Sequence, residues 1–221
     1  MIKKVLIAED HESTNISVQK TLEELKITDT DYVYYCDDAL TKIQIAKQKN
    51  QPYDLLITDL YFEEDHRVQQ IPGGAELIAA ARLAQPDLKV LVFSAEGKPM
   101  VIDALVNNQE IDGYVRKARN DARELKQAIE AIGRHQRYFP WLLVQLIKQK
   151  NVHEFTEFDI AIISLLAKGV RQKDIPAQLQ QKQIHPSSLS SVEKRLNHIK
   201  EALNFFNNEQ LVAYCKDMGV V

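Results

Sequence analysis

The sequence predicts an α/β fold for the first half of the chain, a doubly wound parallel sheet, and a small all-α domain for the second half. Three observations predict it. Strand-like apolar segments alternate with amphipathic helical segments in the first half. From Phe155 onward the apolar spacing is wholly helical. The length of 221 residues exceeds the ~100 to 150 residues of most single domains, so two domains are expected.

Composition and the start of the chain narrow the class of protein. With 45% hydrophobic and 27% charged residues, the chain has the profile of an ordered globular protein. The first apolar run ends at Glu9 and Asp10, too early for a signal-peptide core or a membrane span, so we expect a cytoplasmic protein without membrane contact. The two cysteines, Cys36 and Cys215, are far apart and exclude a disulfide framework and a cysteine metal cluster.

Five short segments rich in apolar, β-branched or aromatic residues predict the strands. They are Lys4 to Ala8, Tyr32 to Cys36, Leu55 to Thr58, Val90 to Phe93 and Gly113 to Arg116. The segments between them carry apolar residues three and four apart, as in Val18, Leu22 and Leu25, which is the period of an amphipathic helix. Such alternation implies right-handed crossovers and a parallel sheet covered on both faces.

The functional prediction comes from the polar residues at the strand ends. The first strand is followed by Glu9 and Asp10, the third by Asp59, the fourth by Ser94 and the fifth by Lys117. Ligands of doubly wound sheets bind at the carboxyl ends of the strands. Three carboxylates there would repel one another unless they held a divalent cation, for which Mg2+ is the natural candidate. With a lysine and a hydroxyl to meet phosphoryl oxygens, the set predicts phosphoryl transfer onto an aspartate nucleophile.

Over residues 1–125 the sequence resembles the receiver domain of two-component response regulators. The motifs that carry the resemblance are Leu6 to His11, Leu55 to Leu60, Val90 to Ala95 and Gly113 to Lys117. The resemblance implies a flavodoxin-like sheet with strand order 2-1-3-4-5, bound Mg2+, and a sensor histidine kinase as partner. It also implies that the only catalysis is the chain's own phosphorylation and dephosphorylation.

The same resemblance assigns roles to the metal ligands. Asp10 and Asp59 would bind Mg2+ directly, together with the backbone carbonyl of Tyr61, and Glu9 would act through a bound water. Asp59 would be the residue that accepts the phosphoryl group.

Three further residues would respond to phosphorylation. By the resemblance, Lys117 pairs with Asp59 before phosphorylation and with the phosphoryl group after it. Ser94 would move to donate a hydrogen bond to a phosphoryl oxygen, and Tyr114 would then turn inward into the vacated space.

The first half also contains an unusually long loop, and it ends in a helix that leads to the second half. The long loop from Tyr61 to Pro72 delays the next helix and is either a solvated insertion or a determinant of kinase choice and dephosphorylation rate. Asn120 to Arg137 is expected to form the last helix. The expected domains are residues 1–133 for the receiver, 134–153 for a helical linker and 154–221 for the C-terminal domain.

The second half predicts three successive helices. Thr156 and Asp159 form a capping-box pattern that opens the first helix, which Gly169 ends. Its expected inner face consists of Ile160, Ile163, Leu166 and Ala167. A second helix is expected from Gln172 to Gln181, anchored by Ile175 and Leu179. The third begins after Pro186 and is expected to bury Leu189, Val192, Leu196, Ile199 and Leu203.

Two helices joined by a turn, with bases and serines on the outer face of the second, match a helix-turn-helix that reads the DNA major groove. The stretch from 154 to 216 resembles the LuxR-type DNA-binding domain, through Phe155 to Ile160, Leu165 to Val170, Lys173 to Ile175 and Glu209 to Val212. The resemblance implies double-stranded DNA as partner and a homodimer on activation. The residues expected to face DNA are Ser191, Lys194, Arg195 and His198. Lys173 and Lys200 are expected to contact the DNA backbone.

One departure keeps alternatives open. The turn between Leu179 and Val192 is several residues longer than is usual for that family. The leading hypothesis is a response regulator whose phosphorylated Asp59 controls sequence-specific DNA binding and transcription. The second is a signalling adaptor whose helical domain binds a protein partner, and the third is a phosphatase that uses Asp59 on small substrates.

Overall fold

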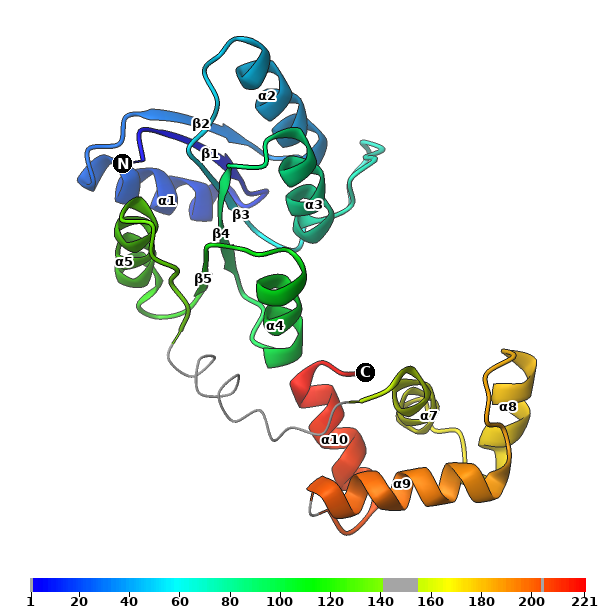
Figure 1. The fold of residues 1–221 in the computed structure, drawn as a ribbon. Helices are drawn as coiled ribbons and strands as arrows, with labels where there is room; N and C mark the ends of the chain where they lie inside the picture. Colours follow the sequence, from blue (N-terminus) through cyan, green and yellow to red (C-terminus); the bar gives the residue numbers. More distant parts are fainter. Residues whose placement is uncertain (1, 141–154, 204) are drawn as a thin grey trace. The chain divides into compact units, whose positions relative to one another are not determined.

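The computed structural model describes residues 2–140, 155–203 and 205–221. These residues form two compact units, one built on a β-sheet and one wholly helical (Figure 1). Within the described residues, every helix is too short or too polar to span a membrane.

The first unit contains a five-stranded parallel sheet. Its strands are β1 (Lys4–Ala8), β2 (Asp29–Val33), β3 (Leu55–Thr58), β4 (Lys89–Ser94) and β5 (Gly113–Arg116). Their order is β2-β1-β3-β4-β5, and each neighbouring pair is parallel, which confirms the predicted topology. The chain reverses its direction of strand addition after β2, so β1 and β3 lie side by side at the switch point.

Helices cover both faces of this sheet (Figure 1). They are α1 (Glu12–Glu24), α2 (Cys36–Gln48), α3 (Gly74–Ala84), α4 (Pro99–Asn108) and α5 (Asp121–Gly133). One core cluster joins the sheet to α1 and α5, through residues such as Leu22 and Leu125, and a second joins it to α2 and α3, through Ile43 and Leu77. Because both faces are buried, Leu55 to Ile57 of β3 and Val90 to Phe93 of β4 are continuous apolar runs.

Two boundaries predicted from the sequence are wrong. The second strand runs from Asp29 to Val33, and Cys36 already begins α2. The last helix of the first unit ends at Gly133, not at Arg137. Beyond it the chain returns to the sheet, where Tyr138 bridges Gly113 and packs against the core of α1 and α5. The remainder of the expected linker, residues 141–153, lies outside the described residues.

The second unit consists of helices alone in its described residues. They are α7 (Glu157–Ala167), a 3-10 turn (Gln172–Asp174), α8 (Ile175–Gln181), α9 (Leu189–Leu203) and α10 (Asn208–Met218). Their shared core includes Ile163, Leu179, Leu196 and Leu211, which are almost fully buried.

The local signals at α7 are confirmed in part. Thr156 and Asp159 form the predicted reciprocal capping box, and Gly169 has a φ of +81°, the left-handed conformation that glycine adopts without strain. The predicted inner face is partly wrong. Ile163 is buried, but the helix also buries Ile162 and Leu165, whereas Ile160 is 39% exposed.

The connection between α8 and α9 is long, as predicted. It spans residues 182–188 and is held to the core by the partly buried Ile184. The hydroxyl of Ser188 accepts the backbone N–H of Ser191 at 3.2 Å, which satisfies one of the free donors at the start of α9. Val192, Leu196 and Ile199 form the buried face of α9, and Leu189 is 39% exposed.

Candidate functional site: an acidic pocket at the carboxyl edge of the sheet

The strand register brings the predicted acidic residues together. Ala8 at the end of β1 pairs with Thr58 at the end of β3, and the backbone N–H of Asp59 donates to the carbonyl of Ala8 at 3.1 Å. The next residues along the two strands are therefore neighbours. Glu9 is 2% exposed and Asp59 is 6% exposed, and the side chain of Asp10 is 14% exposed.

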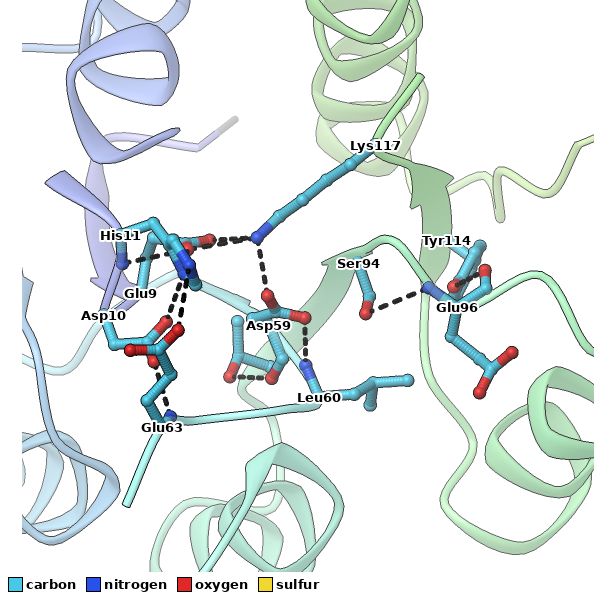
Figure 2. A network of polar contacts seen from close by, with 11 residues as sticks. Glu9, Asp10, His11, Asp59, Leu60, Glu63, Ser94, Glu96, Tyr114 and Lys117 are labelled. Carbon is cyan, nitrogen blue, oxygen red and sulfur yellow. Dashed lines mark hydrogen bonds and ion pairs between the residues drawn. The ribbon is translucent and has the colours of Figure 1, made fainter. Parts of the chain in front are cut away.

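Lys117, which follows β5, reaches across the sheet to two of these acids (Figure 2). Its Nζ lies 2.5 Å from Oδ2 of Asp59 and 2.8 Å from Oε2 of Glu9. Burial lowers the pKa of the Lys117 ammonium, but the hydrogen bonds to Asp59 and Glu9 outweigh burial and raise that pKa above its ordinary value. The lysine is therefore held in its charged form.

One ammonium does not neutralise this pocket. Burial raises the pKa of Glu9, Lys117 lowers it, and the negative charge of Asp59 raises it further, with a net upward shift. Glu9, Asp10 and Asp59 together leave an excess of negative charge at the edge of the sheet. Carboxylate oxygens carrying excess negative charge fit a hard divalent cation such as Mg2+.

Ser94 and Tyr114 lie on the side of Asp59 that faces away from Glu9 and Asp10 (Figure 2). Both side chains are fully buried. The Tyr114 hydroxyl donates to the backbone carbonyl of Glu96 at 2.6 Å, and the backbone N–H of Glu96 lies 3.4 Å from the Ser94 hydroxyl. The aromatic ring predicted to move inward on phosphorylation thus occupies the inward position in this structure.

Two residues that the sequence analysis did not single out also hold the acids. Nδ1 of His11 lies 2.8 Å from one oxygen of Asp10, and the backbone N–H of Glu63 donates to the other oxygen at 2.7 Å. The carboxylates of Glu9 and Asp10 and the ring of His11 each offer a ligand atom, and these atoms lie within 4.8 Å of one another. His11 was visible in the first motif, but no sequence signal connects Glu63 with Asp10.

Asp59 lies in the wall of a cavity of about 390 Å3. Its lining consists of His11, Thr14, Asp59, Tyr61, Phe62, Glu63, Ser94, Ala95 and Lys117. The Tyr61 side chain lies at its rim, where the hydroxyl donates to Oε2 of Glu96 at 2.6 Å. A larger cavity of about 640 Å3 lies at the opposite edge of the sheet, but it contains none of the acids that follow β1 and β3, so chemistry and not size assigns the site.

In the helical unit, the predicted DNA-facing residues differ in their surroundings. Lys173, Lys194 and His198 are exposed, and Ser191 and Lys200 are half-buried. These five positions are compatible with an outer surface.

Arg195 is the exception among the predicted DNA contacts. Its Nε and one terminal nitrogen donate to the two carboxylate oxygens of Asp159 at 2.6 and 2.7 Å. Asp159 is fully buried and also accepts the backbone N–H of Thr156. Burial raises the pKa of Asp159, but Arg195 and Thr156 outweigh burial and hold that pKa below its usual range. Arg195 thus ties α9 to the start of α7.

Comparisons with known proteins agree with this description. The family model of the response regulator receiver domain matches residues 5–130. No match is found among curated proteins.

Solved structures resemble nearly the whole chain. RcsB of Salmonella typhimurium has a TM-score of 0.69 and 21% identity, with 96% of this chain and 98% of that chain covered. RcsB of Salmonella enterica serovar Typhimurium, bound to promoter DNA with the phosphomimetic BeF3-, has a TM-score of 0.63, 20% identity and coverage of 98% and 99%. A structure of two RcsB dimers on two parallel DNAs has a TM-score of 0.66, 19% identity and coverage of 98% and 99%. At these identities the likeness shows the fold.

Proposed function

The chain belongs to the response regulator receiver domain family, and from this membership we propose that phosphorylation of Asp59 by a sensor histidine kinase controls DNA binding by the C-terminal helical domain. The single observation that carries the proposal is the excess of negative charge around Asp59, with Lys117 at 2.5 Å. It supports an aspartate nucleophile beside a metal site.

The donor set supports Mg2+ held by Asp10, Asp59 and the backbone carbonyl of Tyr61, with Glu9 acting through water. The cation would neutralise phosphoryl oxygens and orient the donor. An oxygen of Asp59 forms the bond to phosphorus as the bond between phosphorus and the donor histidine nitrogen breaks. Lys117 then pairs with the phosphoryl group, for which it already carries a positive charge.

Phosphoryl uptake is the first test of the proposal. Full-length protein with Mg2+ and labelled acetyl phosphate should take up at most one label per chain, and Asp59→Asn should take up none. Asp87→Asn, an exposed aspartate outside the pocket, is the matched control and should label like the wild type. Absence of label on the wild type would refute the proposal, and sustained release of phosphate from many donor molecules would favour the small-substrate phosphatase.

The output step is proposed from the helical unit. Its fold resembles that of RcsB, which the solved structures show as dimers on DNA. We assign the DNA-contacting surface to Lys173, Ser191, Lys194, His198 and Lys200, in a chain that dimerises on activation and has the domain order 1–133, 134–153 and 154–221. Arg195 is left out because its donors are engaged by Asp159.

DNA binding can be tested with genomic fragments, with and without BeF3- and Mg2+. The phosphomimetic should tighten binding, the affinity should fall steeply with salt, and Lys194→Ala should weaken binding and reduce the salt slope by about 1. Ala213→Ser, an exposed uncharged position on α10, serves as control. Equal binding by wild type and Asp59→Asn in both conditions would exclude the switch.

One observation favours the adaptor as a second candidate. On the outer face of α9 the basic residues Lys194 and Lys200 are accompanied by the acidic Glu193 and Glu201, so this face carries little net positive charge once Arg195 is paired. DNA-binding surfaces depend on excess positive charge. A salt-insensitive interaction of the phosphorylated chain with a protein, without retention of DNA, would favour the adaptor.

A further inference from the structure

The segment between β3 and α3, residues 61–72, forms a strap that is fixed at both ends. Its tip is solvated, since Val68 is 93% exposed. The backbone on either side of the tip nevertheless makes specific hydrogen bonds to α2 and to the acidic pocket. A solvated insertion without a role would not require both sets of contacts.

The first set of contacts attaches the strap to the start of α2. The carboxylate of Asp37 accepts the backbone N–H groups of Gln70 and Ile71, each at 2.9 Å. In return, the backbone N–H of Cys36 donates to the side-chain oxygen of Gln69 at 3.2 Å. These bonds satisfy donors on both partners, so they fix the C-terminal half of the strap in register with α2.

Arg67 supplies a second attachment to α2. Its two terminal nitrogens donate to the two oxygens of Asp38 at 2.8 and 2.5 Å, and its guanidinium lies 4.3 Å from the centre of the Tyr35 ring. The Tyr35 hydroxyl in turn donates to Asp65 at 2.5 Å. A planar guanidinium can make this bidentate and stacked contact, whereas a lysine ammonium cannot.

The other end of the strap reaches the acidic pocket (Figure 2). The backbone N–H of Glu63 donates to Oδ2 of Asp10 at 2.7 Å, and His11 lies 2.8 Å from Oδ1. Both oxygens of Asp10 are therefore held. The Glu63 side chain is 83% exposed and its Oε1 lies 3.7 Å from Nε2 of His11. The contact with Asp10 comes from the backbone of Glu63, so it depends on the path of the strap.

We propose that the strap positions Asp10 for the metal and that Arg67, as its anchor on α2, is a positioning residue for metal binding. The inference rests on the proposed function, because it takes Asp10 as a metal ligand. A carboxylate whose orientation is already fixed loses less freedom when the metal binds, and hydrogen bonds to ligands are a general determinant of metal affinity. Movement at the start of α2 therefore alters the metal site through the backbone of Glu63.

The experiment compares Mg2+ affinity among variants of the full-length chain. Arg67→Ala and Asp38→Asn each remove the same anchor and should weaken Mg2+ binding roughly 3- to 10-fold, less than the 10- to 100-fold typical when a ligand's direct partner is lost. Arg67→Lys should restore only part of the affinity. Lys42→Ala is the matched control, since it removes a similarly exposed ion pair of α2, with Asp31, and leaves the Arg67–Asp38 pair in place.

Two readouts separate positioning from a general loss of structure. Calorimetry gives the Mg2+ affinity, and hydrogen exchange of the Glu63 amide reports its bond to Asp10. Faster exchange at Glu63 in Arg67→Ala with unchanged exchange in β1 and β3 supports the proposal. An Mg2+ affinity equal to that of Lys42→Ala overturns it.

Failure of this inference and failure of the proposed function give different results. If the wild type takes up no label at Asp59, the proposed function fails. If the wild type is labelled but Arg67→Ala binds Mg2+ as tightly as the wild type does, the inference alone fails.

Discussion

Both units of the chain bury charged side chains, but they balance them differently. At the carboxyl edge of the sheet, Glu9 and Asp59 share the single ammonium of Lys117, and Asp10 adds a third carboxylate. Burial and repulsion raise the pKa of Glu9 there. The negative charge is incompletely compensated within the chain.

In the helical unit the negative charge of the buried Asp159 is compensated. Asp159 meets Arg195 through two hydrogen bonds and accepts a further bond from Thr156. The pKa of this carboxylate is lowered although it is fully buried. Unbalanced buried charge is characteristic of a site that binds or reacts, whereas a balanced and fully hydrogen-bonded pair is characteristic of a structural contact. We therefore expect chemistry at the acidic residues of the first unit and a structural role for Arg195.

The largest effect is expected when the Asp159–Arg195 ion pair is broken. Arg195→Ala removes the two hydrogen bonds of Arg195 from the buried Asp159, which should cost the helical unit about 3 kcal/mol, the lower end of the range for buried pairs because Arg195 is 28% exposed. Hydrogen exchange in α7 and α9 measures this loss. The double variant Asp159→Leu, Arg195→Met should recover much of it, since an apolar pair has no charge to desolvate. A single variant as stable as the wild type would show that the ion pair is not structural.

The second-largest effect is expected when Mg2+ compensates the negative charge of the acidic residues in the first unit. Saturation with Mg2+, at about 100 times its Kd, should stabilise the sheet unit by about 2.7 kcal/mol and leave the helical unit unchanged. Thermal unfolding with hydrogen exchange resolved by residue measures both. Asp59→Asn should reduce the stabilisation because one carboxylate ligand is lost. Equal stabilisation of α9 would indicate that the cation acts elsewhere.

The sequence was sufficient for the sheet because its signals are local. Leu55 to Ile57 are apolar, as residues of a buried parallel strand usually are, and the acids at the strand ends lie together because of the strand order. The edge strand β2 was misplaced because Asp29 to Val33 begins with three polar residues and only Val33 is buried. The face of α7 was misassigned because apolar residues occur on every side of that helix.

Contacts between distant polar residues could not be predicted. Asp159 and Arg195 are 36 positions apart, and Glu63 and Asp10 are 53 positions apart. Residue types alone made Arg195 equally suitable for a phosphate backbone and for a buried carboxylate. Only the packing of α9 on α7 distinguishes the two, and in the structure Arg195 pairs with Asp159.

The smallest expected effect is a difference in the sign of pH dependence between the units, measured without metal. The raised pKa of Glu9 means that the folded sheet unit binds a proton more tightly than the unfolded chain, so this stability is present at or below pH 4.5 and is lost as pH rises through the folded pKa. The lowered pKa of Asp159 has the opposite sign: its contribution is present above pH 3.8 and is lost as pH falls through the folded pKa. Hydrogen exchange resolved by residue between pH 3 and 7 should show the two trends. Glu9→Gln should flatten only the first and Asp159→Asn only the second, and parallel trends in the two units would contradict the contrast between unbalanced and balanced charge.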